Sequence, residues 1–183
     1  MLKLSENPPV LFPAVDDLAS IPGMWWVAHT KARCEKSFAT DLAGHGIAYF
    51  LPMIERVTFS GGRKRRGMMP LFSSYVFFCG SEKERHQALL TDRLCQAIVV
   101  KDQRKFVSEI SCIHQVLRSG MTIDPYPSAT VGRRCRIARG PLEGIEGTIV
   151  RRQDGAQRLV LQVTMLGQGA AVEIEPDLLE TVA

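Results

Sequence analysis

The chain has 183 residues, of which 45% are hydrophobic and 23% are charged. This balance is that of an ordinary globular protein with one large or two small domains. No apolar run approaches the roughly 20 residues that span a bilayer, and the first 22 residues lack the basic start and apolar centre of a signal peptide. We therefore expect a cytoplasmic protein without membrane contact. The five cysteines form no CxxC pair, which argues against a zinc site and favours reduced thiols.

The net charge of +4 is unevenly distributed along the chain. Residues 1–23 hold one Lys and three acids, a net charge of −2. Residues 24–120 hold 15 Lys and Arg against 8 acids, a net charge of +7, and residues 121–183 hold 7 against 8, a net charge of −1. The middle segment is therefore the one that suits a polyanion, and the last segment should have a different partner.

The first half of the chain begins with a proline-rich stretch. Residues 1–23 contain four prolines and no sustained periodicity, which predicts a flexible extension. The large β-forming residues at 25–29 predict a first strand, and apolar residues at every fourth position from 34 to 42 predict a helix. Residues 47–51 predict a short second strand.

A hairpin is predicted next. Apolar segments at 54–59 and 68–72 flank a tip, residues 60–67, that contains three glycines and four cations; this pattern is typical of a β-hairpin. Residues 71–78 follow and predict a strand that is buried on both faces.

Two further helices complete this half. Ser81 and Glu84 have the spacing of a capping box, which predicts the start of the second helix. A strand is predicted at 97–100, and apolar residues between 106 and 117, at spacings of four, three and four, predict the third helix. The order of these elements predicts an α+β fold for residues 24–120, with an antiparallel sheet and flanking helices.

The second half has a different pattern. Residues 121–130 are polar and contain prolines, which predicts a linker. Within residues 131–183, short strands are predicted at close spacing with turns between them, at 134–138, 147–152, 159–163 and 171–174. No helical period occurs there, so a small all-β barrel is expected.

Several motifs resemble those of the NusG family. Residues 131–150, with a Gly140-Pro141 turn and glycines that permit unusual backbone conformations, resemble the KOW motif. Residues 25–31 (WWVAHTK) resemble the opening strand of the NusG N-terminal domain. Residues 70–77 resemble its central P-L-F-P-x-Y-x-F strand, with Ser73 in place of the usual proline. The resemblance extends over residues 24–182 and implies an SH3-like fold for the KOW barrel. Residues 50–52 and the basic hairpin resemble specialised, RfaH-like paralogues.

The resemblance implies a polymerase-binding surface. In the family, an apolar pocket of the N-terminal domain binds the coiled-coil clamp helices of the largest RNA polymerase subunit. The matching positions are Trp26, His29, Pro52, Tyr75 and Phe77. Strand alternation puts Tyr75 and Phe77 on one face, and that face can be either the pocket or the core.

The resemblance also implies two further kinds of contact. In the family the hairpin lies near upstream DNA, and in the specialised paralogues the region beside the first strand contacts non-template DNA. The candidate nucleic-acid-binding residues are Lys31, Arg33, Lys36, Arg63, Lys64, Arg65 and Arg66. A solvated loop without a partner is the alternative for the hairpin. In the KOW barrel, the positions that would bind a ribosomal protein or a termination factor are Leu142, Ile145 and Leu166; the alternative is that these residues complete a small core.

We therefore expect a monomeric, non-enzymatic transcription elongation or antitermination factor that promotes processive transcription. No catalytic triad, Walker motif, Rossmann fingerprint or metal-ligand cluster occurs in the sequence, so no catalytic residue, metal or cofactor is expected. The alternative is a KOW-containing RNA-binding or ribosome-associated protein, which fits poorly with the net charge of −1 in residues 121–183. Whether the protein is a general factor or an operon-specific antiterminator stays open.

Overall fold

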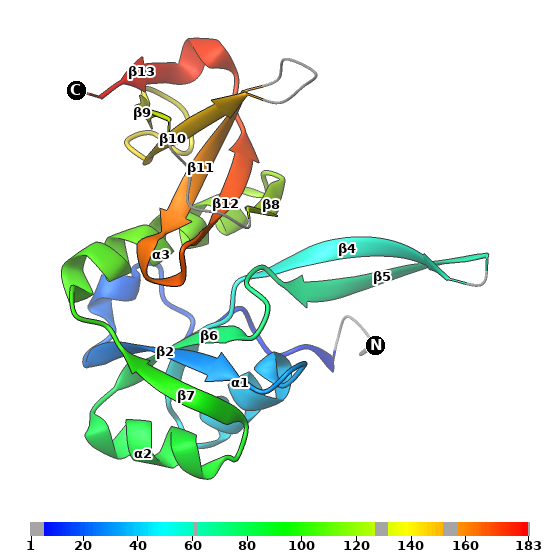
Figure 1. The fold of residues 1–183 in the computed structure, drawn as a ribbon, viewed down its shortest axis with the longest axis vertical. Helices are drawn as coiled ribbons and strands as arrows, with labels where there is room; N and C mark the ends of the chain where they lie inside the picture. Colours follow the sequence, from blue (N-terminus) through cyan, green and yellow to red (C-terminus); the bar gives the residue numbers. More distant parts are fainter. Residues whose placement is uncertain (1–5, 61, 127–131, 152–156, 183) are drawn as a thin grey trace. The chain divides into compact units, whose positions relative to one another are not determined.

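The computed structural model describes residues 6–60, 62–126, 132–151 and 157–182. By its internal contacts the chain divides into an N-terminal unit, Met1–Gln103, and a C-terminal unit, Arg104–Ala183. Figure 1 shows the helices and strands of both units. Among the described residues, no helix combines the length and the apolar character needed to cross a membrane.

The N-terminal unit is built on an antiparallel sheet in the order β1-β3-β6-β2-β7. Its strands are β1 (Leu11–Phe12), β2 (Met24–Thr30), β3 (Ala48–Phe50), β6 (Tyr75–Gly80) and β7 (Leu94–Val99). The central strand β6 is buried on both faces along most of its length, as its apolar sequence predicts. Residues 71–74, which were expected to belong to this strand, precede it instead.

Two helices cover one face of this sheet. They are α1 (Glu35–Gly44) and α2 (Glu82–Leu90), and α2 begins with the predicted capping box of Ser81 and Glu84. The buried core between helices and sheet contains the sheet residues Trp26, Ala28, Tyr49, Val76 and Phe78 and the helix residues Phe38, Ala39, Leu42 and Ala88. Side chains alternate along a strand, so the neighbours of these residues in β2 and β6 belong to the opposite face.

A long hairpin forms a separate two-stranded sheet. Its strands are β4 (Met53–Ser60) and β5 (Arg63–Pro70), paired from Met53 opposite Pro70 to Ser60 opposite Arg63. Figure 1 shows that the hairpin projects away from the five-stranded sheet. The hairpin itself agrees with the prediction from the sequence, but residues 63–67 of the predicted tip belong to strand β5.

The C-terminal unit contains nearly all of helix α3 (Gln103–Ser119) and an all-β sheet in the order β13-β9-β10-β11-β12-β8. The strands are β8 (Ile123–Tyr126), β9 (Arg133–Ile137), β10 (Glu146–Arg151), β11 (Gln157–Val163), β12 (Gln168–Glu173) and β13 (Leu179–Thr181). Its core is small and apolar, with Ile137, Leu159, Val163 and Val172 each at most 3% exposed. The predicted α+β class with a C-terminal all-β part is thus confirmed.

Two expected segments differ from the structure. Of the expected flexible extension, residues 1–23, the structure describes residues 6–23, where Leu11 pairs with Phe50 through β1 and Leu18 and Ile21 are buried. Apolar burial thus holds this proline-rich stretch to the domain. In the expected linker, residues 123–126 form β8 and pair with β12. The rest of that linker, residues 127–130, lies outside the described residues.

Candidate functional site

A stacked pair of partly exposed rings lies on the sheet face that α1 and α2 do not cover. His29 of β2 is directly opposite Tyr75 of β6 in the antiparallel register. Their ring centroids are 5.2 Å apart with an interplanar angle of 28°, a geometry that favours offset stacking. Both side chains are half-buried. Two of the predicted polymerase-binding residues therefore form one aromatic surface.

The other predicted polymerase-binding residues do not share this exposure. Phe77 lies on the same face as Tyr75 but is 0% exposed, and its ring centroid is 6.1 Å from that of Phe50. Pro52 is buried. Trp26 is 2% exposed and belongs to the core beneath α1 and α2, so it lies on the opposite face of the sheet. Of the five predicted residues, only His29 and Tyr75 are accessible from outside.

A buried carboxylate fixes the turn that leads into Tyr75. The side chain of Glu35 is 7% exposed, and its Oε1 accepts a hydrogen bond of 2.7 Å from the backbone N–H of Ser74. Ser74 has a φ of 65°, a conformation that costs energy for a residue with a Cβ. The Ser74 carbonyl accepts a hydrogen bond of 2.8 Å from the backbone N–H of Thr30. Glu35 thus joins the ends of β2 and β6 where the two rings stack.

The sequence did not single out Glu35. The available signal was its place in the first turn of the predicted helix, where an acid is favourable because of the helix dipole. Its partner, Ser74, is 39 residues away in the sequence, and no local pattern predicts that contact.

The predicted cations beside β2 make different hydrogen bonds and ion pairs. The Lys31 amine lies 2.7 Å from a carboxylate oxygen of Asp92, and this hydrogen bond, with the charge of Lys31, lowers the pKa of Asp92. The Lys36 amine donates to the side-chain oxygen of Asn7 and to the Met68 carbonyl, each at 2.6 Å. Burial lowers the pKa of Lys36, an effect that the charge of Glu35 opposes. The Lys36 amine is thus bonded within the N-terminal unit, and its role in nucleic-acid binding stays a prediction.

Arg33, the third predicted cation of this region, is exposed. It has a φ of 62° in the turn before α1, so the turn presents its side chain outside the sheet. Nucleic-acid binding by Arg33, and by Lys31 with its amine paired to Asp92, stays a prediction.

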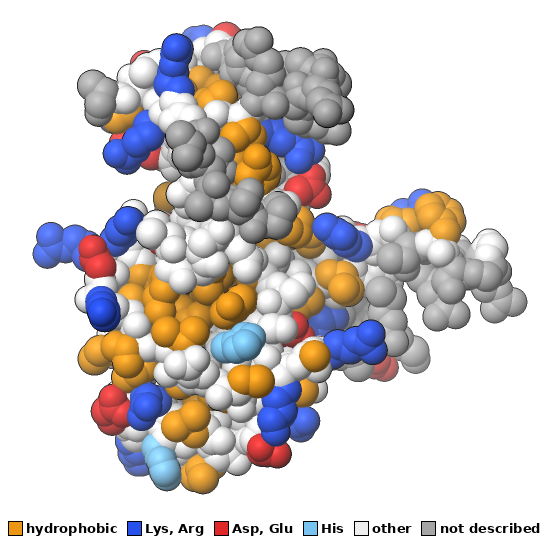
Figure 2. Space-filling view, viewed as in Figure 1, with side chains coloured by type: hydrophobic (Ala, Val, Ile, Leu, Met, Phe, Trp, Pro, Cys, Tyr) orange, Lys and Arg blue, Asp and Glu red, His pale blue; other side chains and the backbone are white. Residues whose placement is uncertain are grey.

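The hairpin carries the strongest concentration of positive charge. Lys64 and Arg66 are exposed, and Arg66 makes a long, solvent-exposed ion pair of 3.6 Å with Glu55, a type of contact that contributes little to stability. The side chains of Arg63 and Arg65, also predicted to bind nucleic acid, lie outside the described residues. Figure 2 shows hydrophobic side chains among the cations on the projecting hairpin.

The predicted partner-binding residues of the C-terminal unit are mostly buried. Leu142 and Ile145 are each 3% exposed, and the Ile145 carbonyl accepts a hydrogen bond of 2.9 Å from the Ile137 N–H. These two residues complete the small core, which was the alternative that the sequence left open. Leu166, in a short 3-10 helix after β11, is half-buried and is the one candidate of the three that remains accessible.

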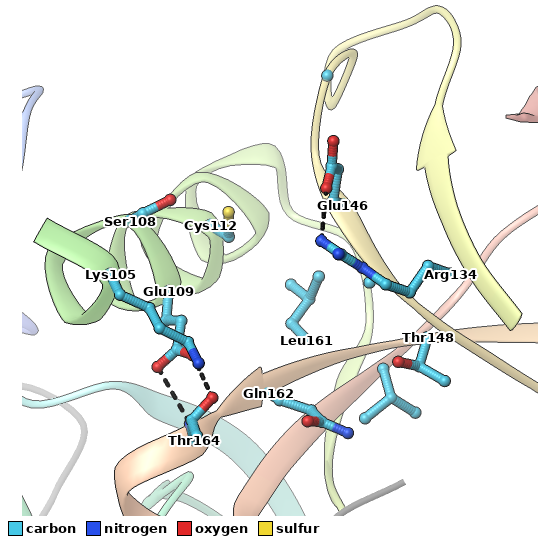
Figure 3. Close-up of a pocket in the computed structure, with 13 residues that line it drawn as sticks. Lys105, Ser108, Glu109, Cys112, Arg134, Glu146, Thr148, Leu161, Gln162 and Thr164 are labelled. Carbon is cyan, nitrogen blue, oxygen red and sulfur yellow. Dashed lines mark hydrogen bonds and ion pairs between the residues drawn. The ribbon is translucent and has the colours of Figure 1, made fainter. Parts of the chain in front are cut away.

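A cavity of about 690 Å³ lies within the C-terminal unit, between α3 and strands β9 to β11 (Figure 3). Its charged side chains are paired: Arg134 lies 3.0 Å from Glu146, and the Glu109 carboxylate accepts hydrogen bonds from the backbone N–H and hydroxyl of Thr164. Burial, followed by the nearby carboxylates, raises the pKa of the Cys112 thiol. The raised pKa favours the neutral thiol, which is less nucleophilic than the thiolate.

In the part of the chain that the structure describes, no group of three or more His, Cys, Asp or Glu side chains could hold a metal ion.

Comparison with known proteins decides the family. The NusG family model, described as transcription termination factor NusG, matches residues 23–119, which is more than half of the chain. The chain belongs to the NusG family. NusG-family proteins are non-enzymatic transcription factors, so this protein is a transcription factor of the NusG type, and the prediction that it is not an enzyme is confirmed.

Other comparisons add little. A solved structure from work on domain interaction in Thermotoga maritima NusG is similar, with 15% sequence identity and a TM-score of 0.46 over 87% of this chain and 97% of that chain. A comparison with curated proteins found no match. The family match contains the aromatic pair, Glu35 and the hairpin, and it ends after α3. The resemblance of residues 131–150 to a KOW motif stays a prediction.

Proposed function

We propose that this NusG-type transcription factor binds RNA polymerase through the sheet face that carries His29 and Tyr75, and that the clamp helices of the largest subunit are its target. The observation that carries the proposal is the stacked ring pair, half-buried at the margin of a face whose other aromatic residues are fully buried. Aromatic side chains held rigidly in this way are typical anchors for a helical partner, because they lose little entropy on binding.

The proposed consequence is processive transcription. A factor that binds the closed polymerase clamp better than the open clamp shifts the population toward the closed state and so discourages pausing. The exposed cations of the hairpin and of the turn at Arg33 would meet upstream or non-template DNA, with phosphate as the shared target. These roles would be carried out in the cytoplasm by a monomer.

The proposed domain organisation follows the family match. Residues 24–120, which include α3, would be the polymerase-binding domain, and residues 131–183 would be a KOW domain that recruits a ribosomal protein or a termination factor. The contacts group most of α3 with the C-terminal sheet. We prefer the domain boundary after α3, which the family match gives, because the residues that a family model covers recur together in its members. In the C-terminal unit, Leu166 is the candidate contact residue.

The direct test is the affinity of the full-length protein for core RNA polymerase, with and without Tyr75→Ala. We expect that the substitution weakens binding at least tenfold, which corresponds to about 1.4 kcal/mol. The matched control is His86→Ala, which removes an exposed ring from α2 on the other side of the sheet, and its affinity should stay within twofold of the wild type. Failure of the wild-type protein to bind polymerase would contradict the proposal and direct attention to ribosomes and RNA.

A further inference from the structure

The hairpin places two exposed apolar side chains beside two cations. In the register of β4 and β5, Phe59 is directly opposite Lys64, and Val57 is directly opposite Arg66. Directly opposite residues share a face, and so do residues two apart on one strand. These four residues, here called the tip face, therefore lie on one side of the hairpin.

The apolar members of the tip face are unusually open to water. Phe59 is 77% exposed and Val57 is 44% exposed. In the described part of the chain, the hairpin is a sheet of two strands only, and such an isolated hairpin is marginally stable. A phenyl ring in this position is not explained by a core. An exposed apolar patch rimmed by polar groups is typical of a binding surface.

Charge indicates what this surface binds. Residues 53–70 hold five Lys and Arg and one Glu, a net charge of +4 that equals the net charge of the whole protein. The remainder of the chain holds 18 Lys and Arg against 18 Asp and Glu and is neutral. The positive excess is thus concentrated on the element that also exposes an aromatic ring, and this combination is that of a groove or finger that binds unpaired nucleotides.

We propose that the tip face binds single-stranded nucleic acid, with Phe59 stacked on an unpaired base and Lys64 and Arg66 against neighbouring phosphates. Opposite side chains on paired strands begin roughly 5 Å apart, so a ring and an ammonium group can reach one nucleotide together. In duplex DNA the flat faces of the bases are covered by their neighbours, so the ring has nothing to stack on. The inference refines the nucleic-acid role in the proposed function but does not depend on the contact between His29, Tyr75 and polymerase.

The test is fluorescence anisotropy of the full-length protein with a labelled 12-nucleotide oligothymidine, the matching 12-base-pair duplex, and a 12-residue abasic strand. The wild type should bind the single strand at least tenfold more tightly than either the duplex or the abasic strand. Phe59→Leu, which keeps an apolar side chain but removes the ring, should lose about tenfold in affinity for the single strand. Its affinity for the duplex should be unchanged.

Two controls separate stacking from charge and from general hydrophobicity. Lys64→Gln should weaken binding to all three probes and lower the dependence of binding on salt by about one phosphate contact. Leu90→Ala removes another apolar side chain of similar exposure, 72%, from α2 and should change nothing. Because the tip face is exposed, all variants should keep the thermal midpoint of the wild type.

The inference is overturned if the wild type does not prefer the single strand, or if Phe59→Leu binds it as well as the wild type. Binding of the Phe59→Leu variant to core RNA polymerase, measured in parallel, distinguishes the two proposals. Intact polymerase affinity with unaltered single-strand binding would refute the role of the tip face and leave the polymerase interface standing.

Discussion

Replacing Glu35 by Ala should destabilise the N-terminal unit by about 2 kcal/mol. The carboxylate is 7% exposed and accepts the Ser74 N–H at 2.7 Å, and a hydrogen bond to a buried charged group contributes about 1.5–3 kcal/mol. Its removal leaves the Ser74 N–H without that acceptor in a turn that already has a positive φ. Glu35→Gln retains an oxygen that can accept the same bond, so it should cost less than about 1 kcal/mol.

Urea denaturation followed by tryptophan fluorescence is suited to this measurement, because both tryptophans of the protein, Trp25 and Trp26, lie in the N-terminal unit. The matched control is Glu82→Ala on α2, whose carboxylate is 72% exposed in a surface ion pair with Arg85 and should contribute less than about 0.5 kcal/mol. If Glu35→Ala and Glu82→Ala destabilised equally, the account of the buried carboxylate would be refuted.

Three further predictions concern other elements. The hydrogen bonds of the capping box with Ser81 lower the pKa of Glu84. The difference in unfolding free energy between the wild type and Glu84→Ala should therefore be largest at pH 7 and vanish as the pH falls through that lowered pKa. Urea denaturation at a series of pH values measures this difference. Gly147→Ala would place a Cβ 2.7 Å from a backbone carbonyl of β11 and should lower stability by about 1–3 kcal/mol, whereas Gly44→Ala, with nothing within 4 Å, should be neutral or slightly stabilising in thermal unfolding. Burial raises the pKa of the Cys79 thiol to about 11, so a thiol reagent at pH 8 should label the exposed Cys95 rapidly in the folded protein and Cys79 only on unfolding.

The sequence predicted those elements whose signals are local. The spacing of apolar residues, the capping box and the glycine-rich tip predict the helices and the hairpin. These signals can be found in the sequence because they depend on residues only a few positions apart. The strands β1 and β8 gave no such signal. They are two and four residues long, and their pairing with β3 and β12 joins segments about 40 residues apart. A proline-rich stretch predicts a flexible chain, but the burial of the Leu18 and Ile21 side chains holds this one against the domain.

The site was predicted less completely, for a related reason. Motif matching places Trp26 beside the pocket, but a motif does not record which face of a strand packs against the helices. The alternation of side chains along a strand correctly places Tyr75 and Phe77 on one face of β6. Only the three-dimensional structure shows that the Phe77 side chain is buried. In so small a β-sheet nearly every aliphatic side chain is needed for the core, which explains the burial of Leu142 and Ile145.

The most direct test of the central claim is photocrosslinking of the full-length protein to core RNA polymerase. A photoreactive benzoyl-phenylalanine would replace Tyr75, and in a control it would replace Leu90, which is exposed on α2. We expect an efficient crosslink from position 75 to the largest polymerase subunit, mapped by mass spectrometry to its clamp helices, and little or none from position 90. A crosslink to the clamp helices from position 90 but not from position 75 would contradict the proposal that the His29–Tyr75 face is the polymerase interface.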